Sequence, residues 1–599
     1  MFLRAKAVLF LVVLAVPVFG QQAVDEAAQE RQKSTLALLE QIGNDARQLK
    51  LPENRAFVAA KVGAAIWKAD EKQARKLFNT VAEDLIAAQA EADAQSRNRQ
   101  YQNGLIYGQE PRWTILITIA NCDALLALDI MTRTRPARLA RMMADADTAG
   151  EAGAMGKRHR LTGSSTAHFA VNELQNEQQL ISRAADQDPL RAISLVQESL
   201  KKGVTYQTLG MLQKIHTKDP EAAKRLTGDA VRKLLEIDLV RYMNHADTIG
   251  YFLGQVSNNG DGSGNDLRIS DDLIRQMAEK MIKFWLDPDV KSFYGNGTAF
   301  NTIEKLFPDR AARVKQKFDQ INDSVQSPHQ REYTRVLSEN VPIEEMIKSA
   351  EKMPEPYMRN EIFRRAAQKM IEAGSIDRAE KLLEDNMGDE DANNYISQTL
   401  VNHSYTVMGS GKPEEAYAMI SRIPNPEQKI SLLVNLATTV YYKDPKANDK
   451  WAASVLGEAR SFLPDEIETA EDITAFISIA NASAAIQQDE SFRMAESLVP
   501  TLNEISSANA VLAKLRNYGT FRNGEFQLSA GHYAMGISGF ENLLNALKEK
   551  DFDRAVGIAN GLNRPDVRLA YLLQMINSNQ ISNLPINTRV FISGFGRGE

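Results

Sequence analysis

The chain has 599 residues, a net charge of −6, 43% hydrophobic residues and 25% charged residues, which are fractions typical of folded proteins and exclude disorder throughout. Its single cysteine excludes an internal disulfide and any cysteine-rich zinc or iron–sulfur site. The length indicates either several domains or one long repeat array, and the low share of Gly (34) and Pro (20) favours helix.

The first twenty residues have the pattern of a secretory signal peptide. Arg4 and Lys6 precede an apolar run, and Val18-Phe19-Gly20 places small or aliphatic residues at the −3 and −1 positions of a cleavage site. We therefore predict cleavage near Gly20 and export to the periplasm or the cell exterior. An uncleaved anchor is the alternative, but the run is short for a bilayer. Loss of Arg4 and Lys6 takes the net charge from −6 to −8, which disfavours a nucleic-acid-binding surface.

The strongest later apolar run is Trp113 to Met131. It contains Asn121, Asp123 and Asp129, which are costly in lipid, so we predict a buried core helix and no integral membrane segment after signal removal. Cys122 lies within this run and is interpreted as a free, buried structural thiol. A nucleophilic role is the alternative, and it would require a histidine or cation brought near by folding.

Basic residues cluster after this run. The segment Asp145–Ser165 is rich in small residues and is predicted to be a mobile connection. An alternative is that the basic residues together attract an anionic polymer. They are Arg133, Arg135, Arg138, Arg141 and Lys157-Arg158-His159-Arg160.

A loop at residues 257–266 resembles a calcium-binding loop in part. Asn259 to Gly264 alternates oxygen-bearing side chains with glycine, but the twelfth position is Ser270, which cannot supply the bidentate carboxylate of such loops. We favour a flexible loop in which Ser270 caps a helix that begins at Asp271.

The segment from Asn360 to Glu372 predicts one helix of a helical hairpin. Apolar residues recur at helical spacing on two adjacent rows, Ile362/Ala366/Met370 and Phe363/Ala367/Ile371. Gly374 suits a left-handed helix terminus, and a second helix is predicted to begin at Ser375–Asp377 with Ala379, Leu382 and Leu383 facing inward.

The second half of this hairpin recurs. The pattern Asp-Arg-Ala followed three residues later by an aliphatic residue begins at Asp309, Asp377 and Asp553. Looser copies begin at Ala74, Ala192, Ala223, Ala416, Ala452 and Ala495. Several spacings lie between 30 and 45 residues, which is typical of helical solenoids. We expect the aspartate to cap its helix and the alanine to allow close helix packing.

Four Asp-Pro pairs suit a helix start, with aspartate as N-cap and proline at the first helical position. They are Asp188-Pro189, Asp219-Pro220, Asp287-Pro288 and Asp444-Pro445.

Gly411 to Ile420 and Gly374 to Leu383 resemble the turn and second helix of tetratricopeptide-like repeats. The chain as a whole resembles exported bacterial helical-repeat proteins of this degenerate type. Other α-solenoids with longer periods remain alternatives. The resemblance implies a stacked helical surface that binds other proteins, and it implies no catalytic residues.

The predicted fold is all-α, an α-solenoid or superhelix of stacked helical hairpins, with strand-like alternation only near Arg589–Ser593. The predicted organisation has five segments: a signal peptide (1–20), an N-terminal helical region (21–150), middle repeats (151–330), tetratricopeptide-like repeats (331–576) and an irregular tail (577–599).

No motif for catalysis, cofactor binding or metal binding is found, so no site residue of these kinds is predicted. The seven histidines never have zinc-motif spacing, and Gly409–Lys412 lacks the earlier glycine of a phosphate-binding loop. We expect a non-enzymatic scaffold outside the cytoplasm whose partner is another protein. The alternative is an envelope enzyme that acts on polysaccharide and is built on a helical superhelix or toroid.

Overall fold

The computed structural model describes residues 33–98, 109–137, 139–140, 166–240, 245–257, 267, 269–290, 297–325, 328–338, 340–464, 466–516, 520–530 and 539–576. The predicted signal peptide, the tail at 577–599, Arg589–Ser593, Arg138, residues 141–165 and residues 258–266 lie outside this part of the chain. Two compact units are present. Unit 1 comprises Met1–Leu38, Val325–Asn517 and Gly531–Met575, and unit 2 comprises Leu39–Ser324, Tyr518–Ala530 and Ile576–Glu599.

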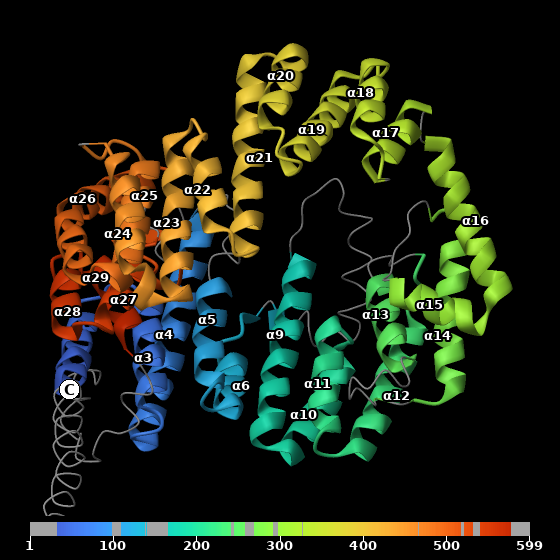
Figure 1. Cartoon of the computed structure of the whole chain (residues 1–599). Helices are drawn as coiled ribbons and strands as arrows, with labels where there is room; N and C mark the ends of the chain where they lie inside the picture. The colour runs from blue at the N-terminus through green and yellow to red at the C-terminus, as the bar shows by residue number, and fades with distance from the viewer. Residues whose placement is uncertain are drawn as a thin grey trace, which may run out of the picture. The chain divides into compact units, whose positions relative to one another are not determined.

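Each unit is built from two layers of helices that alternate along the chain (Figure 1). The A layer of unit 2 consists of α3 (Pro52–Ile66), α5 (Gln109–Ala120), α9 (Thr166–Gln187), α11 (Tyr206–His216), α13 (His245–Ser257) and α15 (Gly297–Leu306). Its B layer consists of α4 (Glu71–Asn98), α6 (Ala124–Arg133), α10 (Pro189–Lys202), α12 (Pro220–Glu236), α14 (Asp271–Leu286) and α16 (Pro308–Val325).

Unit 1 repeats this arrangement. Its A layer consists of α17 (Pro328–Ser338), α19 (Pro356–Glu372), α21 (Asp389–Gly409), α23 (Pro426–Lys443), α25 (Ala470–Ile486), α27 (Phe540–Lys548) and α29 (Pro565–Met575). Its B layer consists of α18 (Ile343–Glu351), α20 (Ile376–Met387), α22 (Pro413–Ser421), α24 (Pro445–Ser461), α26 (Gln488–Leu515) and α28 (Phe552–Asn560). Helices pack on their chain neighbours and on their layer neighbours, so the predicted α-solenoid is confirmed.

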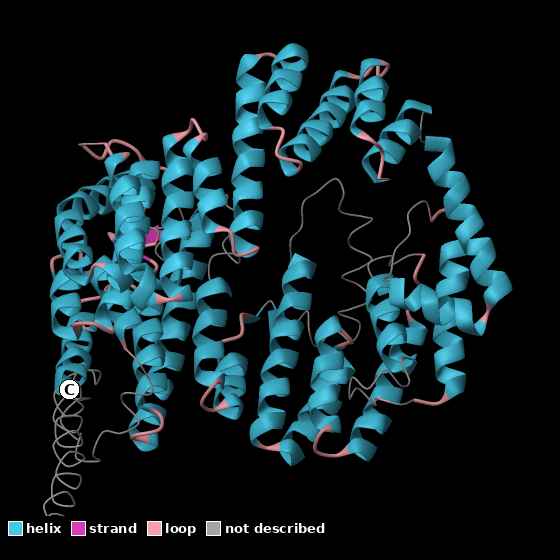
Figure 2. Cartoon of the chain, in the orientation of Figure 1, coloured by secondary structure: helices cyan, strands magenta, loops and turns pink. Residues whose placement is uncertain are grey.

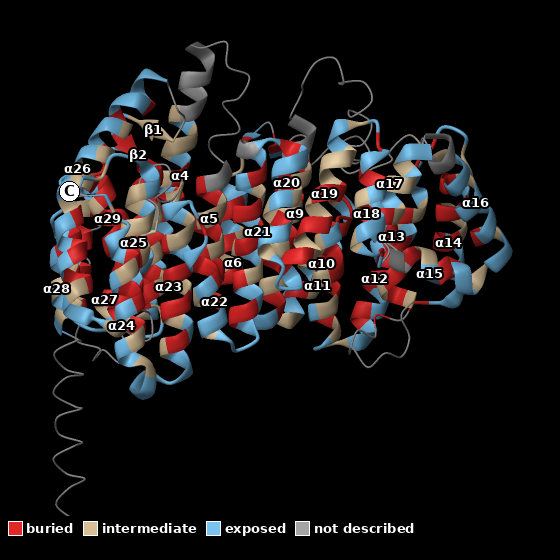
Figure 3. Cartoon of the chain, turned by 45° about the horizontal axis from the view of Figure 1, so that its top comes forward, coloured by how far each residue is buried: buried red, intermediate tan, exposed pale blue. Residues whose placement is uncertain are grey.

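Alanine sits where the layers meet. In all nine copies of the repeat the alanine is at most 1% exposed, and most of the aliphatic residues three positions later are buried too. Buried and exposed residues alternate along the helices of both units (Figure 3). The predicted stripes of α19 are likewise buried, and Gly374 has φ +78° at the end of that helix. The periodicity therefore identified the packing face correctly.

The predicted capping is confirmed at most positions. Asp188, Asp219 and Asp444 accept hydrogen bonds from the first turns of α10, α12 and α24, and Ser270 caps α14. The prediction for Asp287-Pro288 is wrong, because Asp287 follows the last turn of α14 and its carboxylate accepts from the N–H of Asp289 at 2.9 Å in a turn.

The capping role predicted for the Asp-Arg-Ala aspartate is also wrong. Asp309, Asp377 and Asp553 lie inside the first helical turn, where they complement the helix dipole, and Asp551 is the residue that caps α28. The arginine of the motif has the connecting role instead. It pairs with a glutamate two helices earlier in the same layer: Arg310 with Glu279 (3.6 Å), Arg378 with Glu344, and Arg554 with Glu496 (2.7 Å).

Lysines also connect successive B-layer helices of unit 2. Lys233 of α12 donates to the carbonyl of Lys201 at the end of α10 (3.0 Å). Lys280 of α14 donates to Leu235 O at the end of α12, and Lys317 of α16 donates to Trp285 O at the end of α14, both at 2.8 Å. Each ammonium group thus satisfies carbonyls that a helix end leaves without partners.

The apolar run from Trp113 to Met131 does not form one helix as predicted. It is split between α5 and α6 at Asn121–Asp123. The break occurs because the Asp123 carboxylate caps α6 by accepting from Leu126 N at 2.9 Å. Cys122 lies in this turn and is half-buried, so the predicted buried position in a helix is wrong.

The sequence led us to expect helices throughout residues 331–576, but the structure also contains a short β-hairpin there. A hairpin of β1 (Phe521–Arg522) and β2 (Glu525–Phe526), followed by the 3₁₀ helix η1 (Leu528–Ala530), lies between α26 and α27 and belongs to unit 2 (Figure 2). Asn523 and Gly524 both have positive φ, at +51° and +86°. An Asn-Gly pair between two phenylalanines is the hairpin signal that helical periodicity obscured.

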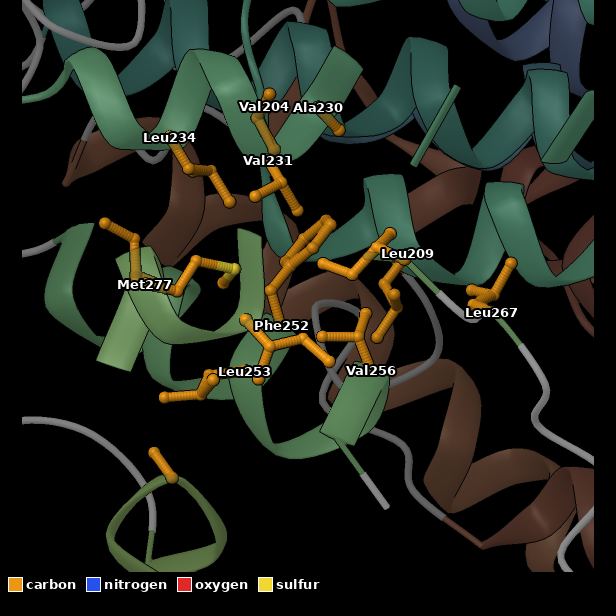
Figure 4. Close-up of a cluster of buried hydrophobic side chains, with 14 of the residues drawn as sticks. Val204, Leu209, Ala230, Val231, Leu234, Phe252, Leu253, Val256, Leu267 and Met277 are labelled. Carbon is orange, nitrogen blue, oxygen red and sulfur yellow. The ribbon is translucent and has the colours of Figure 1, made fainter. Parts of the chain in front are cut away.

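One large core cluster of unit 2 is formed mainly by α10 to α16. Phe252 packs among Leu209, Val231, Leu253 and Met277, so that A-layer and B-layer side chains interdigitate (Figure 4). Within the described residues, no helix combines the length and the apolar composition needed to cross a membrane.

Candidate binding surfaces

Exposed polar side chains recur on several A-layer helices of each unit. In unit 1 every A-layer helix packs on the next A-layer helix, and in unit 2 the closest A-layer pairs are α3 with α5, α9 with α11, and α13 with α15. Helices α9, α11 and α13 of unit 2 and α21, α23 and α25 of unit 1 each leave polar side chains exposed, whereas α3 and α5 show no exposed residue among those whose burial is described.

The stripe in unit 2 has mixed chemistry. We call it the mixed face, and it consists of Arg183 and Asp186 of α9, Tyr206 and Lys214 of α11, and Asp247 and Tyr251 of α13. Tyr206 is 52% exposed and Tyr251 is 37% exposed. Lys214 Nζ lies 3.1 Å from Asp186 Oδ1 and ties α11 to α9. Exposed tyrosines surrounded by charges of both signs are the composition of protein–protein interfaces.

The stripe in unit 1 carries no charge. We call it the uncharged face, and it consists of Gln398, Asn402 and Tyr405 of α21, Ser431, Asn435 and Tyr442 of α23, and Thr474, Ser478 and Asn481 of α25. The Asn435 side-chain amide donates to the Tyr405 hydroxyl at 3.2 Å and thereby joins two of the three helices.

Sequence reasoning named no residue of either face. The signal for the uncharged face is present in the sequence, because residues 392–411, 430–442 and 473–488 contain no Asp, Glu, Lys or Arg. We did not identify it, because apolar periodicity defines the buried side of a helix and disregards the composition of the other side.

A network of buried charges lies between α5, α6, α9 and α10. Arg112 donates to both oxygens of Glu173 (2.9 and 3.1 Å), and Arg135 donates to Glu173 (2.9 Å) and to Glu177 (2.7 Å). Lys202 completes the network on Glu177. Burial acts to raise the pKa of Glu173, but Arg112 and Arg135 outweigh it and hold that pKa below its usual range. These opposite charges satisfy one another and join four helices.

This network bears on the alternative that the basic residues after Met131 attract an anionic polymer. Arg135 is buried in it, and Arg133 pairs with Asp129 on its own helix at 3.4 Å. Arg135 is therefore not part of a basic surface, whereas Arg133 remains exposed beside Asp129.

Cys122 has the electrostatics of an inert thiol. Burial raises its pKa to about 11, and the neighbouring Asp123 carboxylate adds to the rise. A nucleophilic cysteine needs the opposite shift. Among the residues that the structure describes, no group of three or more His, Cys, Asp and Glu side chains is placed to hold a metal ion.

Comparison with known proteins identifies no family. No protein-family model and no curated protein matches the chain. One solved structure that it matches is described as a "Circular tandem repeat protein with novel repeat topology and enhanced subunit contact surfaces". The match covers 88% of this chain and 98% of that one, at 14% identity and a TM-score of 0.18, which is too low to support any conclusion.

Proposed function

We infer that the chain is an exported, non-enzymatic scaffold of the tetratricopeptide-like kind, which binds another protein in the cell envelope or outside the cell. The observation that carries this proposal is the mixed face of unit 2. Tyr206 and Tyr251 supply rigid aromatic area, and Arg183, Lys214 and Asp186 supply charges that orient a polypeptide partner.

The state of one buried acidic pair supports this proposal over a polysaccharide-cleaving enzyme. Such an enzyme needs two carboxyl groups within reach of its substrate. Glu173 and Glu177, the buried acidic pair of α9, are bound instead by Arg112, Arg135 and Lys202.

Site-specific photo-crosslinking in the producing cell tests the protein partner. A photoreactive phenylalanine analogue at Tyr206 or Tyr251 should capture the same protein. The same analogue at Leu190, which is 82% exposed on the B-layer helix α10, is the matched control and should capture nothing specific. Equal capture from Leu190, or no capture from either tyrosine, would contradict the proposal. N-terminal sequencing of the secreted protein should begin at Gln21, which tests the export and cleavage separately.

A further inference from the structure

The uncharged face of unit 1 has a composition that burial does not explain. A quarter of all residues in the chain are charged, yet α21, α23 and α25 carry none over residues 392–411, 430–442 and 473–488. The buried sides of these helices need apolar residues, but their exposed sides face water, where charged side chains are ordinarily tolerated. The absence of charge on the exposed side therefore indicates a requirement of its own.

The exposed groups of this face share one chemistry. Gln398, Asn402 and Asn435 carry amides, and Ser431 and Thr474 carry hydroxyls, so each both donates and accepts hydrogen bonds. Two tyrosine rings are accessible among them, with Tyr405 at 44% exposed and Tyr442 at 70% exposed.

The two rings lie along one line of the surface. Tyr405 is level with Asn435 through their hydrogen bond at 3.2 Å. Tyr442 follows Asn435 by seven residues on the same stripe of α23, a rise of about 10 Å along the helix. Gln398 and Asn402 precede Tyr405 on α21, and Ser431 precedes Asn435 on α23, so the amides and hydroxyls lead up to Tyr405 and Tyr442 lies one step beyond it.

We propose that this face binds an uncharged polysaccharide. The hydroxyls of a sugar donate and accept hydrogen bonds, as the amides and hydroxyls of the face do, and the C–H faces of sugar rings pack on aromatic rings. Charged side chains stand at the edges of this face, at Glu427, Lys443 and Glu471, and the row between them has none with which to match the charges of a polypeptide partner. Amides and hydroxyls also lose less free energy than ions when a ligand displaces their water.

This site is distinct from the mixed face, so each has its own test. Isothermal titration calorimetry of the full mature protein is carried out with neutral hexasaccharides of glucose, mannose, galactose and N-acetylglucosamine. We expect at least one to bind, with an affinity that stays constant between about 0.05 and 0.5 M NaCl because no ion pair forms. Tyr442→Ala and Tyr405→Ala should each weaken binding about tenfold.

Tyr206→Ala on the mixed face is the matched control, because it removes an exposed tyrosine of unit 2. It should leave sugar binding unchanged and weaken capture of the protein partner. Tyr442→Ala should weaken sugar binding and leave capture of the protein partner unchanged. Both tyrosines are exposed, so neither substitution is expected to unfold the chain. The proposal would be overturned if none of the sugars bound, or if sugar binding did not change in the Tyr405 and Tyr442 variants. It would also be overturned if this face bound an unfolded uncharged polypeptide and none of the sugars.

Discussion

The Glu525 carboxylate accepts a hydrogen bond from the backbone N–H of Leu51 at 3.1 Å, although the two residues are 474 positions apart. Its other oxygen accepts from the N–H of Lys50 at 2.7 Å. Leu51 precedes α3 and has no side chain that could cap the helix. The hairpin therefore supplies the anionic cap that the local sequence lacks. Asn54 fixes the register, because it donates to Phe526 O (2.8 Å) and accepts from Leu528 N (2.9 Å).

Replacement of this distant cap should loosen the start of α3. We expect Glu525→Ala to destabilise unit 2 by about 2–3 kcal/mol, since it leaves buried N–H groups without a charged acceptor. Hydrogen exchange of the Lys50 and Leu51 amides measures the effect directly. Glu525→Gln retains one acceptor oxygen and should therefore lose less stability than Glu525→Ala. Unchanged exchange at both amides in Glu525→Ala would show that the hairpin does not cap the helix.

The buried network should make unit 2 sensitive to acid. The pKa of Glu173 is lowered in the folded chain, so its contribution to stability is complete above about pH 4.5 and is lost as the pH falls through the lowered value. Glu173→Gln should cost about 3–5 kcal/mol at neutral pH, because it leaves the buried Arg112 without a carboxylate and Arg135 with Glu177 alone. It should also flatten the acid dependence of urea unfolding.

Glu332→Gln is the control for this prediction. The pKa of Glu332 is also lowered, chiefly by its hydrogen bond from Arg335, but both side chains are exposed. Its substitution should therefore cost less than about 1 kcal/mol. An equal loss of stability in the two variants would refute the role assigned to burial.

The single thiol should react slowly. With a pKa of about 11, Cys122 forms about 100-fold less thiolate at pH 8 than a cysteine with a pKa of 9.0, and the thiolate is the reactive form. Alkylation by iodoacetamide in the native and the urea-unfolded protein checks this. Asp123→Asn should speed the native reaction, because it removes the neighbouring negative charge. A native rate equal to the unfolded rate would contradict the raised pKa.

Substitution of two glycines of unit 1 by alanine should change the stability of the folded chain in opposite directions. Gly374 has φ +78° and open space around its Cβ position, so Gly374→Ala should destabilise the turn after α19 by about 1 kcal/mol through backbone strain alone. Gly457 lies within α24 and also has open space, so Gly457→Ala should stabilise by about 0.5–1 kcal/mol. Thermal unfolding compares them, and a change of the same sign in both would contradict this assignment.

The sequence by itself determined the helices, the alanine-lined packing faces and most caps. These features follow from interactions within a few residues, such as the row of Ile362, Ala366 and Met370 or the cap of Asp219 on α12. Only the tertiary structure decided which distant groups meet. Arg135, expected on a basic surface, is buried against Glu173, and Glu525 caps a helix 474 residues away. The exposed faces also required the fold, because periodicity shows which side of a helix is buried and not which exposed sides adjoin one another.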